Sequence, residues 1–105
     1  MSTSALVPTM AALGDETRWS ILEALGAGEA SASALAETLP VSRQAIAKHL
    51  AVLHEVGLVE PVRVGKELRY RALGARLSDV ARTLDGIGAA WDARLAIIRD
   101  LAERA

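Results

Sequence analysis

The sequence predicts a mainly α-helical domain that carries one two-stranded β-hairpin, and three patterns lead to this prediction. Apolar residues recur at helical spacing over most of the chain, alternate with period two over 58–73, and form a long near-heptad stripe over 77–101. The 105 residues give room for one small domain, which we expect to span 1–105. Because such a chain buries only a modest core alone, a dimer is a reasonable expectation.

Caps and breakers divide the first half of the chain into four expected helices, over 5–13, 16–26, 31–39 and 43–56. Asp15 and Ser42 are good N-cap residues, and either Ser31 or Ser33 can cap the third helix. Pro40 prevents that helix from continuing. Only three residues then precede the fourth helix, so 31–57 predicts a helix-turn-helix that follows N-terminal helices in 5–30.

The second half of the chain predicts a hairpin and one long helix. Residues 58–73 alternate, and Gly65-Lys66 has the composition of a two-residue turn, so this segment would form a wing beside the helix-turn-helix. The remainder, 75–104, continues as a single helical pattern. Gly86 and Gly88 interrupt it, and whether they kink the helix stays open.

The formal net charge of −1 hides an uneven distribution of charge along the chain. Residues 1–41 carry a net charge of −4, residues 42–71 a net charge of +3, and residues 72–105 are neutral. The basic third of the chain coincides with the fourth helix and the hairpin. We expect this third to meet any polyanion that the protein binds.

Composition excludes several classes of function. The chain has no cysteine, which removes disulfides, thiolate metal ligands and cysteine nucleophiles, and its two histidines cannot build an all-histidine metal site. No apolar run reaches the roughly 18 residues of a membrane span. We find no nucleophile–base pair and no glycine-rich phosphate loop. The expectation is a cytoplasmic protein that is not an enzyme and needs no cofactor or metal.

The second helix of a helix-turn-helix has the right width for the major groove of DNA, and the following hairpin can reach the adjacent backbone. With Ile46, Leu50 and Leu53 turned inward, the exposed face of helix 43–56 is rich in hydrogen-bond donors. The candidate DNA-binding residues are Ser42, Arg43, Gln44, Ala47, Lys48, His49, Arg63, Lys66 and Arg69. The ordinary structural roles compete with this interpretation: His49 could be a packing residue, and Arg69 or Arg71 could pair with Glu60 or Glu67.

Three stretches of the chain resemble the ArsR/SmtB family of winged-helix repressors. They are A-L-G-D-E-T-R-W-S-I-L-E-A-L (12–25), V-S-R-Q-A-I-A-K-H-L-A-V-L-H-E-V-G-L-V (41–59) and V-R-V-G-K-E-L-R-Y-R-A-L (62–73). The resemblance covers nearly the whole chain. It implies a winged helix-turn-helix homodimer that binds double-stranded DNA sequence-specifically, usually as a repressor that a signal releases.

The resemblance places the dimer contact on the first and last helices, which agrees with the near-heptad stripe. The residues expected in this interface are Leu6, Met10, Leu84, Ile87, Trp91, Leu95 and Ile98. Trp91 could instead line a ligand pocket. Trp19 is expected to be a packing residue, and Arg18 is expected to form an ion pair with Asp15 at the start of its helix.

The chain departs from the metal-sensing branch of the family, whose members carry a Cys-x-Cys pattern where this chain has Ser31 and Ser33. Hydroxyl groups do not replace thiolates as ligands, so we expect no thiolate metal sensing. The sequence leaves open whether an unidentified small molecule acts as an inducer. The leading interpretation is a transcriptional repressor that binds an inverted-repeat operator. The alternative is a winged-helix protein–protein interaction module with little affinity for DNA.

Overall fold

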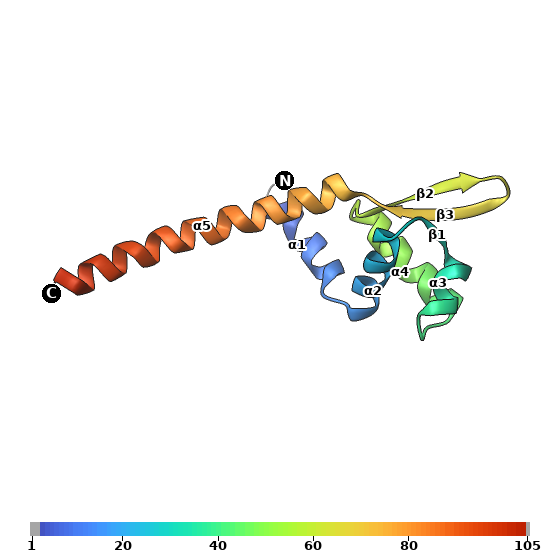
Figure 1. Cartoon of the computed structure of the whole chain (residues 1–105), viewed down its shortest axis with the longest axis horizontal. Coiled ribbons are helices and arrows are strands. Elements are labelled where there is room, and N and C mark those ends of the chain that lie inside the picture. Colours follow the sequence, from blue (N-terminus) through green and yellow to red (C-terminus); the bar gives the residue numbers. More distant parts are fainter. Residues whose placement is uncertain (1–2, 105) are drawn as a thin grey trace.

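A computed structural model describes residues 3–104 of the protein and the side chains of residues 5–104. The elements, in chain order, are α1 (Thr3–Leu13), α2 (Glu16–Gly26), β1 (Ala30–Ser31), α3 (Ala32–Thr38), α4 (Arg43–Glu55), β2 (Val59–Val64), β3 (Glu67–Ala72) and α5 (Gly74–Arg104). The three-helix unit α2–α3–α4 and the β2–β3 hairpin lie at one end of the molecule, and most of α5 projects from the other (Figure 1). The predicted winged helix-turn-helix fold is therefore confirmed.

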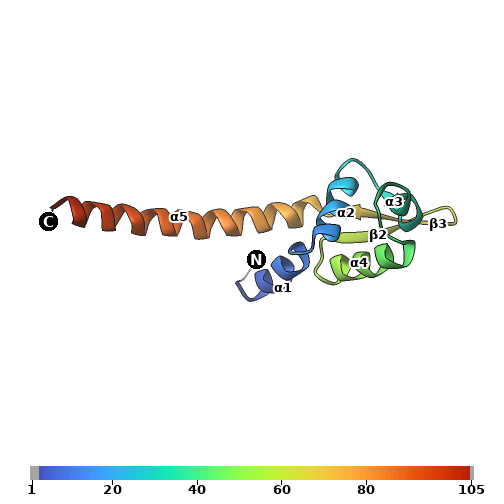
Figure 2. The ribbon, with the colours of Figure 1, turned by 90° about the horizontal axis from the view of Figure 1, so that it is seen from below.

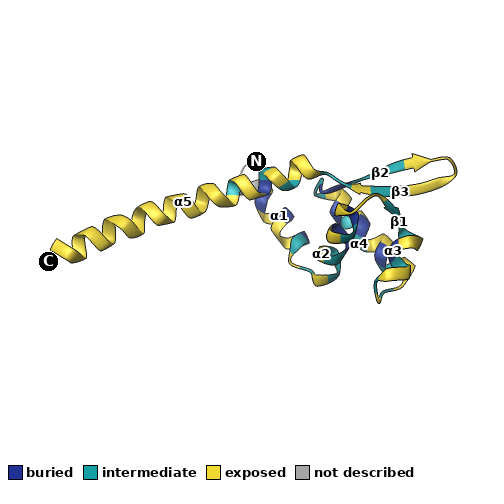
Figure 3. Ribbon diagram, in the orientation of Figure 1, coloured by how far each residue is buried: buried dark blue, intermediate teal, exposed yellow. Residues whose placement is uncertain are grey.

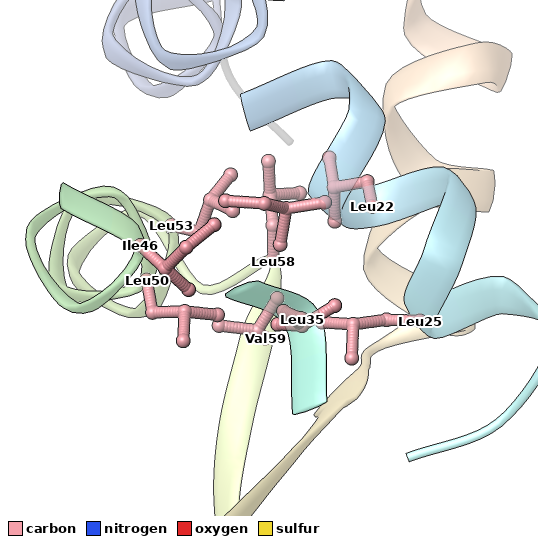
Figure 4. Close-up of a cluster of buried hydrophobic side chains, with 9 residues drawn as sticks. Leu22, Leu25, Leu35, Ile46, Leu50, Leu53, Leu58 and Val59 are labelled. Atoms are coloured by element: carbon pink, nitrogen blue, oxygen red, sulfur yellow. The ribbon is translucent and has the colours of Figure 1, made fainter. Parts of the chain in front are cut away.

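The core lies where α2, α3 and α4 meet the start of the hairpin. Ile46, Leu50 and Leu53 of α4 are completely buried, as their spacing predicts. They contact Leu58 and Val59, which are also completely buried at the base of β2 (Figure 4). The remaining members of this cluster are Ile21, Leu22, Leu25 and Leu35. This packing fixes α4 against the hairpin, so the two elements are presented as one rigid surface.

Side-chain caps define where the three helices of this unit begin. Asp15 accepts a hydrogen bond from the backbone N–H of Arg18, 3.0 Å away, and thereby caps α2. Ser31 caps α3 and Ser42 caps α4 in the same way, each over 3.1 Å. The choice between Ser31 and Ser33 is thus settled in favour of Ser31.

The hairpin pairs β2 with β3 around the two-residue turn Gly65-Lys66, with Val64 opposite Glu67. Gly65 has a φ of 62°, and no residue other than glycine has a positive φ among those described, so the turn resembles type II′. The sheet has three strands rather than the two that the sequence predicts, because the short β1 pairs antiparallel with the free edge of β3. Two residues are too few to show a strand periodicity.

Helix α5 is long and largely unpacked. It runs unbroken through Gly86 and Gly88 and gives the described chain its extent of 69 Å, against 25 and 23 Å in the other directions. Figures 1 and 2 show α1 beside its first turns and no element beside its outer half. Figure 3 shows that this outer half is exposed over its whole circumference. None of the helices in residues 3–104 is long and apolar enough to cross a membrane.

Candidate nucleic-acid interface

The first turns of α4 and the tip of the hairpin face a common groove. This groove has a volume of about 650 Å³ and is also bordered by the start of α3. Four of the predicted DNA-binding residues line it: Arg43, Gln44 and Ala47 from α4 and Lys66 from the turn of the hairpin. Residues that are far apart in the sequence are thus brought to one concave surface, as a helix with an adjacent wing requires.

Sequence reasoning missed several residues of this groove. These are Leu68 and Tyr70 of β3, together with Ser31 and Ser33 from the segment where β1 meets α3. Alternation along the strand could have placed Leu68 and Tyr70 on a common face, since they are two residues apart. Ser31 and Ser33 required the tertiary structure, because α3 and β3 meet through the β1–β3 pairing.

The cationic residues of α4 and of the hairpin tip have free charges. Arg43, Lys48, Arg63 and Lys66 are all exposed. Within the described part of the chain none of the four forms an ion pair. Ser42 is exposed as well, but its Oγ already accepts from the N–H of Ala45. Its hydroxyl hydrogen is left as a donor, so capping and a phosphate contact are compatible.

Arg69 differs from these residues because two carboxylates hold its guanidinium. Its Nε lies 3.2 Å from Oε1 of Glu67, and Nη1 lies 3.4 Å from Oε1 of Glu29. The hydrogen bond with Glu67, followed by that carboxylate's charge, raises the pKa of Arg69 above its ordinary value. In the free protomer the charge of Arg69 is thus paired, and the guanidinium ties β3 to the segment before β1. The contact of Arg69 with DNA stays a prediction.

Arg71 also forms an ion pair within the hairpin. It is opposite Glu60 in the β2–β3 register, and its guanidinium donates to the carboxylate of Glu60. Both Arg69 and Arg71 thus pair with a glutamate of the hairpin, which is the structural role that the sequence left open for them. The net charge of +3 of residues 42–71 already counts Glu60 and Glu67, so it is carried by the basic residues that form no ion pair in the described part of the chain, which are Arg43, Lys48, Arg63 and Lys66.

His49 lies half-buried between α4 and the start of α2. Its Nδ1 is 3.3 Å from Nη1 of Arg18 and 4.0 Å from Oδ1 of Asp15. The hydrogen-bonded packing role considered for His49 is therefore present in the structure. The role expected for Arg18 is wrong in detail, because its guanidinium binds the carbonyl of Ala12 and the ring of His49 rather than the Asp15 carboxylate.

The backbone N–H of Arg18 is the main reason that the pKa of Asp15 lies below its ordinary value of 3.8. The positive charges of Arg18 and of His49, when the imidazole is protonated, act in the same direction. Asp15 is consequently a charged N-cap over the whole neutral range. Its negative charge lies at the N-terminus of α2, where it interacts favourably with the positive end of the helix dipole.

A second surface lies on α5 and carries the residues expected in the dimer interface. Leu84, Ile87, Trp91, Leu95 and Ile98 are all exposed, with Trp91 at 56% and Ile98 at 60%. The guanidinium of Arg94 lies 5.3 Å from the centre of the Trp91 ring. Leu101, the last residue of the predicted stripe, is 61% exposed, and Ile97, which sequence reasoning missed, is 62% exposed. Both extend this apolar face towards the end of the helix.

Two expectations for the first two helices change. Leu6 is only 6% exposed within the protomer, so it has little surface left for a partner and we remove it from the proposed interface. Trp19 is 52% exposed rather than packed. Together with Met10 and Leu84 it borders an apolar groove of about 350 Å³ between α1, α2 and α5, and this groove continues the exposed face of α5.

No group of three or more His, Asp or Glu side chains able to hold a metal ion exists among the described residues. Ser31 and Ser33 are the positions where the family resemblance implies a Cys-x-Cys pattern in metal-sensing members; here Ser31 caps α3 and Ser33 borders the groove. The residues present therefore do not fit a thiolate-bound metal ion.

Comparison with known proteins agrees with this architecture. Residues 13–62 match a family described as a helix-turn-helix domain. The solved structure of an ArsR-like transcriptional regulator from Rhodococcus sp. RHA1 is 62% identical to this chain, with a TM-score of 0.88 over 94% of this chain and 93% of that one. A probable mercury resistance operon repressor from Streptomyces lividans is 34% identical over 69 residues, which are 66% of this chain and 55% of that protein.

A third relative is described as the homodimeric winged helix-turn-helix DNA-binding domain of a possible ArsR-family regulator from Mycobacterium bovis. It is 29% identical, with a TM-score of 0.66 over 85% of this chain and 80% of that one. Fold, groove and relatives together define a DNA-binding transcriptional regulator of the winged helix-turn-helix class. More specifically, the chain belongs to the ArsR family. Members of this family are transcriptional regulators rather than enzymes, and the alternative of a protein–protein interaction module with little affinity for DNA is not supported.

Proposed function

We propose that the protein is a homodimeric repressor that places α4 of each protomer in a major groove of an inverted-repeat operator. The observation that carries this proposal is the groove in which Arg43, Gln44 and Ala47 of α4 meet Lys66 of the wing. Gln44 and Arg43 can pair with adenine and guanine edges, and the small Ala47 permits close approach. Lys48, Arg63, Lys66 and the capping Ser42 would contact phosphates, as His49 would.

The dimer is supported by the exposed apolar residues of α5 and by the homodimeric relative from Mycobacterium bovis. We propose that Met10, Leu84, Ile87, Trp91, Leu95 and Ile98 form the interface, joined by Trp19, Ile97 and Leu101. Two-fold symmetry of the protein then requires two-fold symmetry in the DNA site, with half-sites about one or two helical turns apart. A role in repression is supported by the mercury resistance operon repressor named above. We propose that the protein acts in the cytoplasm.

Selection of genomic fragments by the purified protein tests this proposal. It should enrich one imperfect inverted repeat, and Gln44→Ala should relax the preference at one position of each half-site by a factor of about ten. Glu37→Ala, an exposed change in the acidic front third, is the matched control and should leave the preference unchanged. Enrichment of unrelated fragments, with affinity independent of sequence, would refute the proposal.

The signal is proposed to be something other than a thiolate-bound metal, because the chain has no cysteine and Ser31 caps a helix. A gel-shift assay with the selected operator, with added zinc or mercuric ion or with a chelator, should show the same affinity in all cases. Metal-dependent release would overturn this part of the proposal. A small-molecule inducer stays compatible with it.

A further inference from the structure

Arg18 links the end of α1 to the DNA-facing helix. Its Nε donates to the carbonyl of Ala12 in the last turns of α1, over 2.7 Å, while its backbone N–H donates to the capping carboxylate of Asp15. These two bonds fix the arginine at both ends. A second nitrogen of the guanidinium, Nη1, lies 3.3 Å from Nδ1 of His49 on α4. Residues 31 positions apart are thus joined by a single guanidinium.

The contact with Arg18 selects one form of the His49 ring. A guanidinium has only donors, so Nδ1 must accept, and an imidazole nitrogen accepts only when it carries no proton. Asp15 also faces Nδ1, but its Oδ1 is 4.0 Å away, which is beyond hydrogen-bond distance. The neutral ring then carries its proton on Nε2.

The Nε2 atom is free to bind something outside the protomer. No partner for it exists within the described residues, and in the same part of the chain no buried polar side-chain atom lacks a partner. Nε2 is therefore accessible to solvent, which agrees with a side chain that is 22% exposed. His49 directly follows the exposed Lys48 in the sequence of α4.

We propose that Arg18 is a positioning residue that holds His49 in the Nε2–H form, so that the ring donates this hydrogen to a DNA phosphate. This inference rests on the proposed DNA interface and assigns to it a residue of α2 that itself stays off the DNA. The anchor of Arg18 on α1 also means that the donor is oriented relative to the helix that we place at the dimer contact.

The form of the ring can be tested without DNA. Nitrogen-15 spectra of the imidazole, recorded at mildly alkaline pH, should show His49 of the free protein as the Nε2–H tautomer. In Arg18→Gln the spectrum should shift towards a mixture of tautomers, and His54, which is exposed, serves as the internal reference. A dominant Nδ1–H tautomer in the wild-type protein would overturn the proposal.

The role in binding is tested by a double-mutant cycle on the selected operator. Arg18→Gln and His49→Phe should each weaken binding about tenfold, the loss of one hydrogen bond to a charged group, and the double variant should again be about tenfold weaker rather than hundredfold. Arg82→Gln, which removes the same charge from an exposed position on α5, should have no effect. Equal losses from Arg18→Gln in the presence and absence of His49 would refute the coupling.

Salt dependence distinguishes this role from a direct phosphate contact by Arg18. A neutral donor releases no counterion, so Arg18→Gln should leave the slope of log affinity against log salt unchanged. A slope smaller by about one unit would show that Arg18 itself binds a phosphate and would also overturn the proposal. Thermal unfolding monitored by circular dichroism shows whether the Arg18→Gln variant is folded. If that variant is unfolded, Arg18→Lys, which keeps the charge, is used in its place.

The two experiments separate this inference from the proposed function. If the wild-type protein shows no sequence-specific DNA binding, the proposed function fails and the phosphate contact fails with it. In the other case, the wild-type protein binds its operator normally while the nitrogen-15 spectra show the other tautomer or the double-mutant cycle shows no coupling. Then only the role of Arg18 is wrong.

Discussion

The basic residues of the wing differ in how much of their charge is available to DNA. Lys66 lies at the tip of the hairpin and borders the groove, whereas Arg69 is held by Glu67 and Glu29. An exposed ion pair contributes little to stability, but it does neutralise the cation that a phosphate would need. Composition counts both residues as basic, and only the structure separates them.

This difference predicts opposite results for two similar substitutions. Lys66→Ala should weaken binding to all DNA sequences and lower the slope of log affinity against log salt by about one unit. Arg69→Ala should leave this slope unchanged, because its charge is already compensated in the free protein. Fluorescence anisotropy titrations at several salt concentrations measure both slopes. A smaller slope for Arg69→Ala would show that its ion pairs open on binding.

Asp15 gives a prediction for the dependence of stability on pH. The pKa of Asp15 is lowered in the folded protein, so its contribution is complete above the unfolded value of 3.8 and disappears as the pH falls through the lower folded value. Asp15→Asn keeps an N-cap side chain but does not titrate. Urea unfolding at neutral pH and below pH 3.8 should therefore show a smaller loss of stability on acidification for the variant. An identical acid dependence in the two proteins would exclude this role.

At the scale of elements, the end of α4 determines how the chain enters the wing. The N–H of Gly57 binds the carbonyl of His54, and the N–H of Leu58 binds the carbonyl of Leu53, which is the pattern of a Schellman motif. Gly57 has a φ of 78°, which a side chain disfavours. A Cβ atom there would also lie only 3.3 Å from Nε of Arg76 on α5.

Gly57→Ala should therefore destabilise the protein by about 1–2 kcal/mol, mainly through backbone strain in the left-handed region. Gly26→Ala is the matched control, because Gly26 is helical and nothing lies near the position of its Cβ. That change should be neutral or stabilising by up to about 1 kcal/mol. Urea unfolding of both variants gives the comparison, and an equal effect at the two positions would contradict the assignment of strain to Gly57.

Local signals in the sequence predict the helices and the wing because these elements are built from near neighbours. The cap at Asp15, the break at Pro40 and the turn at Gly65 determine the boundaries, and the turn also determines the register that places Glu60 opposite Arg71. The strand β1 has no such signal, since only its pairing with the distant β3 defines it. The contact between Arg69 and Glu29 depends on the same pairing, so sequence reasoning could not predict this ion pair.

The candidate site shows the same division. Helical periodicity places Arg43, Gln44 and Ala47 on the outer face of α4, and the groove confirms that they share a surface. The link between Arg18 and His49 joins α2 to α4, which β1 and α3 separate in the sequence, and no pattern within α2 or α4 indicates it. Burial also depends on partners elsewhere in the chain: Leu6 and Trp19 are both apolar, yet only Leu6 is covered.

At the scale of the whole molecule, the protomer consists of a winged helix-turn-helix unit and the long helix α5, whose outer half packs against no other described element of the protomer. Exposed leucine, isoleucine and tryptophan residues follow α5 from Leu84 to Leu101, and a contiguous exposed apolar face of this kind marks an interaction site. A second protomer can cover this face by packing its own α5 against it, as the near-heptad spacing of these residues favours. Dimerisation would then set the separation of the two α4 helices, and so the spacing of the operator half-sites.

Trp91→Glu tests this arrangement directly, because it puts a charge without a partner into the middle of the proposed interface. We expect the variant to sediment as a monomer at concentrations at which the wild-type protein is a dimer, and to bind the full operator at least about tenfold more weakly because the two half-sites no longer act together. Ala89→Glu is the matched control: two residues away, it is rotated by about 200° around the helix and is also exposed. That variant should stay a dimer with unchanged operator affinity. Analytical ultracentrifugation and operator titrations measure both properties. A dimeric Trp91→Glu would place the interface elsewhere, whereas a monomeric wild-type protein would remove the dimer from the proposed function.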